Sequence, residues 1–333
     1  DGFNQSSSIT LDVTVSDAEL VDIEIVSRQP QLGVGERSQL LVLGDFADQQ
    51  DVPLIGDYLS YLSSDPSVLS VDVEGNLLGV ADGYAAITVS RDVFSDATAA
   101  TVGLTVDELN RDDGIFVYPG SLTLPLVSGQ RQFLVQTLDG DVDLSTATSG
   151  VMYVLGDSRV VEVSPDGLMT SSALGETTLT IIHGPAEVTV PVRVVQPQVG
   201  SATFGSEGGL LQSSEGTQLQ IPPGALPDGV TVSLDALPIP PQSELPPAEQ
   251  FTVGKAFSLD FGGRELDEPA QVAVPVGSEF VEGDTVYFLR REAMLDSTGL
   301  RREFWLLMET GVVGSDGFAR TSSPPYPGFS AGG

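Results

Sequence analysis

Three aspartates at alternate positions have the residue type and spacing best suited to metal chemistry: Asp139, Asp141 and Asp143. Calcium takes clustered oxygen ligands, and this short segment supplies three carboxylates. It lacks the glycine and the terminal glutamate of an EF-hand loop. The segment is therefore a candidate calcium site, with solvated loop carboxylates as the alternative that the acidity of the chain favours.

The residues that usually carry nucleophilic catalysis are almost absent. The chain contains no cysteine, which excludes thiol nucleophiles, zinc-thiolate sites and disulfides. A serine, histidine and acid triad would need His183, the one histidine, which falls in a predicted His-Gly-Pro hairpin tip. We therefore expect no enzymatic activity, and no cofactor other than the calcium considered above.

Arginine is scarce, and two adjacent pairs flank a predicted hairpin: Arg290, Arg291, Arg301 and Arg302. Arginine pairs with carboxylates in a bidentate manner, so these residues could dock onto an acidic surface of a neighbouring copy. The simpler interpretation is local pairing with Glu292, Glu303 and Asp296.

Near the start of the sequence, four apolar residues alternate with polar ones: Ile9, Leu11, Val13 and Val15. A period of two predicts a strand. This strand could complete the sandwich of a neighbouring chain by β-strand addition. The simpler account is that it closes a preceding domain. No signal-like apolar segment precedes Asp1, so either a signal was removed or the sequence is a piece of a longer chain. A closing strand with no domain in front of it favours the second explanation.

The charge balance excludes several classes of partner. Acidic residues number 47 and basic residues 14, which gives a formal net charge of -33. Nucleic acids and anionic membranes are bound through clusters of lysine and arginine that such a surface lacks, and no apolar run is long enough for membrane insertion. We expect partners among other protein domains of the same or neighbouring chains, or a cell-surface receptor or glycan.

A repeated pattern of short strands and turns positions these residues. Strands are predicted at 68–71, 77–78 and 85–89, with turns between them. The same order of apolar, turn and glycine residues recurs 92 positions later, over residues 157–181. Short strands joined by tight turns indicate antiparallel β-structure, and a period of about ninety residues suits one β-sandwich for each repeat.

Alternating strands are expected to close the two units, at 101–106 and 188–194. The constant spacing is expected to break at the last hairpin, where residues 90–100 shrink to 183–187, because hairpin tips tolerate changes of length. Residues after 198 leave the repeat, but alternating runs bounded by Gly, Pro or Asp predict further strands.

Characteristic positions of the first unit are Gly35, 39–40, 63–68, 71–72, Gly75, 79–83 and 86–89. Together they resemble the bacterial immunoglobulin-like domain of group two, a module of intimin- and invasin-type adhesins. The second unit is similar to a diverged copy, with Gly156-Asp-Ser-Arg in place of Ser-Asp-Pro. In the last segment, Glu207-Gly-Gly, the Ile-Pro-Pro-Gly-Ala-Leu run from Ile221 and Trp305 resemble the domain shared by ankyrins and netrin receptors, in its bacterial form.

The sequence thus predicts an all-β protein, with tandem Ig-like β-sandwiches and a C-terminal β-rich, sandwich-like domain. The expected divisions are a closing or exchanged strand (1–16), two Ig-like domains (17–107 and 108–196), an ankyrin/netrin-receptor-type β domain (197–321) and an extended tail or linker (322–333). The resemblances imply a non-enzymatic, extracellular stalk or adhesive segment of a bacterial cell-surface protein. Two alternatives stay open. One is a subunit of a surface filament or sheath assembled by β-strand addition. The other is an accessory module of a carbohydrate-active enzyme, which predicts a deep cleft lined by aromatic and acidic residues.

Overall fold

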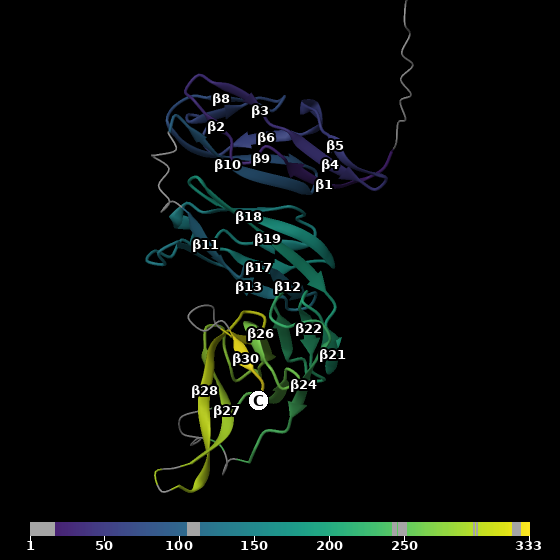
Figure 1. The fold of residues 1–333 in the computed structure, drawn as a ribbon, viewed down its shortest axis with the longest axis vertical. Coiled ribbons are helices and arrows are strands. Elements are labelled where there is room, and N and C mark those ends of the chain that lie inside the picture. The colour runs from purple at the N-terminus through teal and green to yellow at the C-terminus, as the bar shows by residue number, and fades with distance from the viewer. Residues whose placement is uncertain are drawn as a thin grey trace, which may run out of the picture.

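Alternating apolar and polar residues fold the chain into strands grouped around three hydrophobic cores (Figure 1). The computed structural model describes residues 17–104, 114–241, 245, 252–295, 297, 299–321 and 328–333. The three cores draw their residues from 20–102, 115–194 and 202–329. No α-helix occurs within these described residues, and none of their helices is long and apolar enough to cross a membrane. The predicted all-β fold class is therefore confirmed.

The strands of the first domain are β1 Leu20–Ile25, β2 Gln31–Leu32, β3 Arg37–Gln39, β4 Val42–Phe46, β5 Gln49–Pro53, β6 Ser60–Ser63, β7 Leu69–Val71, β8 Asn76–Gly79, β9 Gly83–Arg91 and β10 Phe94–Val102. They form sheets of order β1-β4-β5, β2-β10-β9-β6 and β3-β8-β7. A short 3-10 helix, Gly56–Tyr58, precedes β6. Their inward-facing residues enclose one core, which includes Ile25, Leu69 and Ile87.

The strands of the second domain are β11 Ile115–Tyr118, β12 Leu122–Pro125, β13 Gln130–Gln132, β14 Leu134–Thr137, β15 Met152–Leu155, β16 Val161–Val163, β17 Leu168–Ser171, β18 Gly175–His183 and β19 Ala186–Val195. A 3-10 helix, Ala147–Ser149, precedes β15. The sheets β12-β19-β18-β15 and β13-β17-β16 repeat the strand orders β2-β10-β9-β6 and β3-β8-β7 of the first domain. In each domain the first of these sheets contains one parallel pair, β2 with β10 or β12 with β19.

The repeat continues unbroken through the closing hairpin, so the expected shortening of that hairpin is wrong. Strand β9 begins at Gly83 and β18 at Gly175, while β10 begins at Phe94 and β19 at Ala186, a constant offset of 92 residues. The closing strand of the first domain therefore starts earlier than the sequence pattern suggested. The reason is its composition, Phe-Ser-Asp-Ala-Thr-Ala-Ala-Thr-Val, because alanine and aspartate are poor strand formers in isolation.

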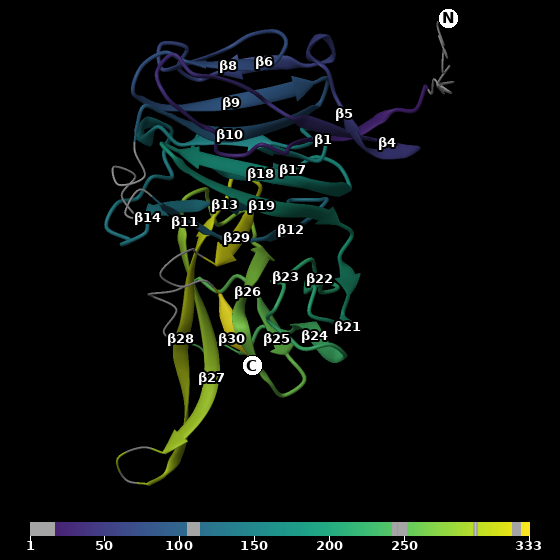
Figure 2. The ribbon, with the colours of Figure 1, turned by 45° about the horizontal axis from the view of Figure 1, so that its top comes forward.

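The strands of the third domain are β20 Gln198–Val199, β21 Ser201–Phe204, β22 Gly209–Gln212, β23 Gln218–Ile221, β24 Val230–Leu237, β25 Ala256–Asp260, β26 Glu265–Pro275, β27 Thr285–Leu295, β28 Arg301–Val313, β29 Phe318–Thr321 and β30 Phe329–Ala331. The larger sheet has the order β20-β22-β23-β26-β29-β28-β27, and the smaller sheet has the order β21-β24-β25. The hairpin of β27 and β28 projects from the body of the domain (Figure 2).

The end of the chain is part of this domain, and the predicted tail is wrong for its last residues. Strand β30 pairs with β26, and the backbone of Gly333 exchanges two 2.8 Å hydrogen bonds with Leu259 in β25. The ring of Phe329 meets that of Phe288 edge-on, with centroids 5.7 Å apart. An aromatic side chain that packs on the core holds this short segment against the sheets, which proline and glycine content alone does not reveal.

The first two domains contact each other through the faces of their sheets. Figures 1 and 2 show β9 and β10 lying directly over β18 and β19. A fourth cluster of buried apolar residues lies between these sheets, separate from the two domain cores. The two sandwiches are therefore stacked rather than strung end to end.

Candidate functional site

Small side chains form the apolar part of the contact between the first two domains. Ala86, Ala97 and Ala99 project from β9 and β10, and Ile182 in β18 meets them. Their exposed fractions are at most 6%, and Met152 and Val154 in β15 pack around them. Alanine lets two sheets approach closely, so the residues that weakened the strand prediction for β10 are those that form this contact.

A charged network completes the contact. The Arg28 guanidinium donates from Nε to Glu187 Oε1 and from Nη1 to Asp96 Oδ2, each over 2.7 Å. The second oxygen of Glu187 accepts hydrogen bonds from the Thr98 hydroxyl (2.8 Å) and the Ala99 N–H (2.9 Å). Glu187 belongs to the second domain and its other partners to the first, so one carboxylate joins the domains by three hydrogen bonds.

The network places two nearly buried carboxylates around one guanidinium. The side chains of Asp96 and Glu187 are 11% and 6% exposed. Burial raises the pKa of Asp96, although the Ile25 N–H and the Arg28 charge oppose this shift. Buried charges are tolerated when their remaining lone pairs are satisfied, and here backbone N–H groups supply that satisfaction.

Backbone groups fix the orientation of the contact. At the start of β10, the Ser95 N–H donates to the carbonyl of Gly156 over 2.9 Å, and the Ser95 hydroxyl donates to the carbonyl of Leu155 over 2.6 Å. Phe94 and Asp157 form an isolated antiparallel bridge. Because backbone hydrogen bonds constrain both direction and register, the domains meet in one defined arrangement.

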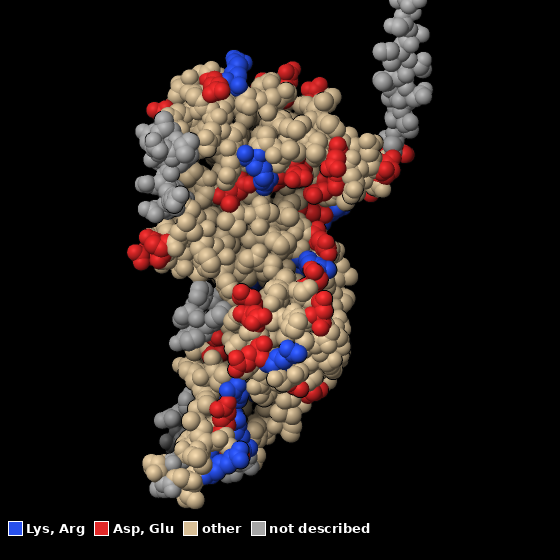
Figure 3. Space-filling view, in the orientation of Figure 1, with Lys and Arg blue, Asp and Glu red and all other residues tan. Residues whose placement is uncertain are grey.

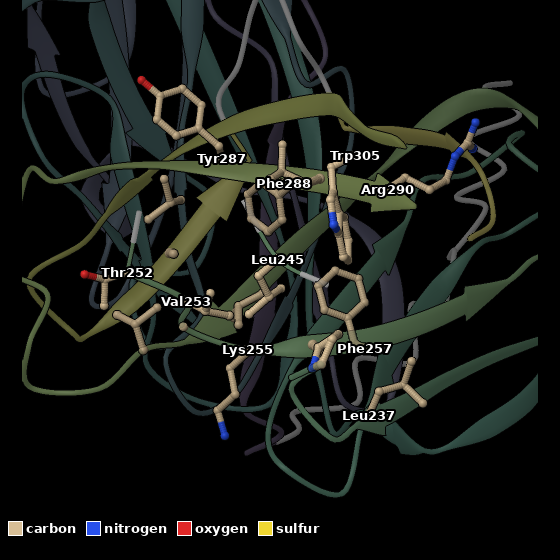
Figure 4. Close-up of a pocket in the computed structure, with 18 of the residues that line it drawn as sticks. Leu237, Leu245, Thr252, Val253, Lys255, Phe257, Tyr287, Phe288, Arg290 and Trp305 are labelled. Atoms are coloured by element: carbon tan, nitrogen blue, oxygen red, sulfur yellow. The ribbon is translucent and has the colours of Figure 1, made fainter. Parts of the chain in front are cut away.

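A pocket of about 630 Å³ lies in the third domain, at the base of the projecting hairpin (Figure 4). Trp305 from β28 and Phe257 from β25 point toward one another across it, and Phe288 from β27 points into it. Two acids, Glu279 and Asp284, also line the pocket. Aromatic faces beside carboxylates can hold a ligand that offers both C–H surfaces and hydroxyl groups.

The four predicted arginines lie together on the projecting hairpin. Figure 3 shows basic side chains along this arm, at the lower end of the view. Arg290 forms an ion pair with Glu292, and Arg291 with Glu303. These are local pairs of the kind that the simpler interpretation names. Arg301 and Arg302 are exposed near the tip of the arm, beside the exposed side chains of Leu295 and Leu300.

Two of the three aspartates of the candidate calcium site, Asp139 and Asp143, accept hydrogen bonds with their carboxylates within their own loop. Asp139 Oδ1 accepts from the Asp141 N–H over 3.1 Å, and its hydrogen bond from Thr137 lowers its pKa. Asp143 Oδ1 accepts from the Ser145 hydroxyl over 2.6 Å. Among the described residues, no three side chains of His, Cys, Asp or Glu gather in a way that could hold a metal. The loop geometry therefore gives the calcium prediction no support.

The structure describes the predicted position of His183 but not the predicted strand at residues 9–15. His183 ends β18 and pairs with Ala186 across a two-residue turn, so its predicted place at a hairpin tip is confirmed. Ile9, Leu11, Val13 and Val15 lie outside the described residues, so the strand-addition hypothesis stays a prediction.

The residues at the contact between the first two domains escaped the sequence analysis. Arg28, Asp96 and Glu187 are separated by 68 to 159 positions, and no local motif connects them. One signal was present, because the alternate alanines at 97 and 99 are unusual in a strand that faces water. Alanines on the outer face of a sheet can indicate a second sheet packed against it.

The comparisons with known proteins leave the family open. No protein-family model matches the sequence. Among curated proteins, it is similar to Ice-binding protein 1 of Shewanella frigidimarina (strain NCIMB 400), with 28% identity over 220 residues. The match covers 65% of this chain and 24% of that protein, so the chain spans about a quarter of the length of this relative.

Solved structures give weak similarities to tandem β-domain proteins. Domains 5-6 of the S-layer protein SbsC share 17% identity, with 55% of this chain and all of that chain covered and a TM-score of 0.23. Human protocadherin-24 EC1-2 shares 13% identity, with 54% of this chain and all of that chain covered and a TM-score of 0.19. Scores of this size support no conclusion, so the fold is defined by its own sheets and cores.

Proposed function

We propose that this chain is a non-enzymatic structural segment of a bacterial cell-surface protein, in which stacked β domains act as a stiff extracellular spacer that carries adhesive elements. The observation that supports it most is the contact between the first two domains. A spacer transmits position only if its domains do not rotate freely, and domain contacts in one chain otherwise permit relative motion. Here buried alanines, a charged network and backbone hydrogen bonds hold the two sandwiches together.

The composition of the chain fits this proposal. A net charge of -33 favours solubility and mutual repulsion of neighbouring rods outside the cell. The relative named for ice binding is matched over about a quarter of its length, so we do not extend ice binding to this segment.

The test places a charge inside the contact. In Ala97→Glu, a carboxylate replaces a methyl group that is fully buried between the sheets, and its desolvation should separate the two domains. Because the chain has no cysteine, spin labels attached to Glu74→Cys and Glu162→Cys report the distance between the domains by pulsed electron resonance. We expect a narrow distance distribution in the labelled parent protein and a broad one after Ala97→Glu.

The control is Ala81→Glu, which places the same charge on an exposed turn of the first domain. It should leave the distance distribution narrow. A broad distribution in the labelled parent protein would contradict the stiff spacer, because it would show that the domains already move independently.

The pocket of the third domain favours a second candidate function, glycan binding by an accessory module. This alternative predicts a cleft lined by aromatic and acidic residues, and the pocket has Trp305, Phe257 and Phe288 together with Glu279 and Asp284. Trp305 is the one tryptophan of the chain, so its fluorescence reports on this pocket alone. A sugar that stacks on the indole should shift the emission in a saturable manner.

The titration uses soluble tetrasaccharides of glucose and of N-acetylglucosamine, with the full chain. Phe257→Ala should abolish an emission shift that comes from sugar bound in the pocket, because it removes the ring that faces Trp305. Phe304→Ala, an exposed ring on the same hairpin, should preserve it. No emission change up to about 10 mM, the limit of even weak recognition, would exclude these glycans as ligands.

A further inference from the structure

A small cavity lies at the junction of the second and third domains and is lined mainly by hydrogen-bond donors. Its volume is about 30 Å³. Six of its lining residues carry guanidinium or amide groups: Gln130, Arg131, Gln218, Gln220, Gln271 and Arg320. None of its lining residues is acidic. Both domains contribute, with Gln130 and Arg131 from β13 and the other glutamines named here from β23 and β26.

Arg131 is buried at this junction with part of its guanidinium unused. The residue is 7% exposed, and its Nη1 donates to Gln271 Oε1. Its Nε and Nη2 are buried and have no hydrogen-bond partner among the described residues. Buried donors of an ionised group rarely stay unsatisfied in folded proteins, so these two N–H groups indicate a missing hydrogen-bond acceptor.

The guanidinium of Arg131 lies over the ring of Tyr118, 5.5 Å from its centroid, and a hydrogen bond with Tyr118 helps to keep it charged, but it has no close acidic partner. No carboxylate of the described residues lies within 4.0 Å of the Arg131 guanidinium. The nearby Asp316 forms its ion pair with Arg320 instead. Glu309 acts on Arg131 from a distance, but burial raises the pKa of Glu309 to about 7, so it is a partial counter-charge at neutral pH. Burial lowers the pKa of Arg131 to about 10, which still leaves it charged.

We propose that this cavity binds one small monatomic anion of the halide class, held by Arg131 and the surrounding amide groups, and that the ion fixes the second domain to the third. A cavity needs about 10–15 Å³ to hold a water, so the volume suits one halide ion or two waters better than the larger sulfate or phosphate ions. Water would satisfy the free N–H groups but would leave the buried charge uncompensated. An anion satisfies both.

Thermal unfolding of the full chain in two salts tests the proposal. Sodium chloride is compared with sodium gluconate at one ionic strength, because screening alone stabilises so acidic a protein. A ligand that binds only the folded state raises the unfolding midpoint with its concentration, so each tenfold rise in chloride above its dissociation constant should add about 3–6 °C. Equal midpoints in chloride and gluconate would overturn the proposal.

A pair of variants locates the effect. Arg131→Met removes the buried charge while keeping an unbranched side chain, and it should abolish the difference between chloride and gluconate. Arg264→Met removes an exposed arginine of the third domain and should preserve that difference. A chloride effect that persists in Arg131→Met would place the ion elsewhere and overturn the assignment.

Crystals of the parent protein grown in bromide give a readout that does not depend on the folding of a variant. An anomalous bromide peak within about 3.5 Å of Arg131 Nε or Nη2 is the expected result. Water density alone at that position, with no anomalous signal, would overturn the proposal.

Discussion

At the scale of single residues, Glu309 is a carboxylate whose burial disfavours its charged form, and this effect cannot be predicted from the sequence of its strand. Its residue is 2% exposed, and its carboxylate accepts the N–H groups of Thr310 over 3.1 Å and Gly328 over 3.0 Å. Burial raises its pKa from 4.5 to about 7 despite these donors. The folded third domain therefore binds a proton more tightly than the unfolded chain does.

The stability of the third domain should consequently depend on pH. A raised carboxyl pKa means that the folded state holds more protons between about pH 4.5 and 7, so the free energy of unfolding falls as pH rises through this window. The loss is about 3 kcal/mol at most. Urea unfolding followed by Trp305 fluorescence measures it, because Trp305 lies on the same strand as Glu309.

Two variants separate this effect from the general repulsion of acidic groups. Glu309→Gln should flatten the dependence between pH 4.5 and 7, whereas Glu303→Gln, an exposed acid on the same strand, should keep the parent slope. Parallel curves for the parent protein and Glu309→Gln would show that Glu309 is not the titrating group.

At the scale of elements, how far a strand can be predicted from its sequence depends on which of its two faces are covered by the rest of the protein. Strand β10 is buried on both faces, since Phe94, Ala100 and Val102 face the core of the first domain while Ala97 and Ala99 face the second domain. A strand covered on both faces loses the apolar and polar alternation by which strands are recognised. The sequence pattern, which predicted a strand at 101–106, therefore included only the last two residues of β10 and missed its beginning.

Strand β30, at the end of the chain, is likewise held by a contact with distant residues that its own sequence does not reveal. Phe329 packs on Phe288 and on the core of the third domain. We expect Phe329→Ala to lower the free energy of unfolding of this domain by about 1–3 kcal/mol, because it removes a half-buried ring and its edge-on contact. Urea unfolding followed by Trp305 fluorescence gives the value.

Phe304→Ala is the matched control, since this ring is 41% exposed on the projecting hairpin. It should change stability by no more than about 0.5 kcal/mol. If the two variants lose equal stability, the packing of β30 is not what holds the end of the chain.

At the scale of the whole molecule, two different junctions join the three domains. The first junction is face-to-face, apolar at its centre and charged at its edge, and its guanidinium and carboxylates are satisfied within the described residues. The second junction is polar and contains unsatisfied donors of a buried arginine. We therefore expect the first junction to supply the stiffness of the proposed spacer. We expect the stability of the second junction to depend on the anions in the solvent.

The sequence by itself determined the all-β class, the repeat of 92 residues and the strands β7 to β9 with their copies β16 to β18. These depend on alternation and turn residues within short windows, which are local properties. The tertiary structure alone decided the start of β10, the attachment of Phe329, and the partners of Arg28 and Arg131. Those outcomes depend on groups brought together from distant positions, where burial and charge compensation, rather than local pattern, set the free energy.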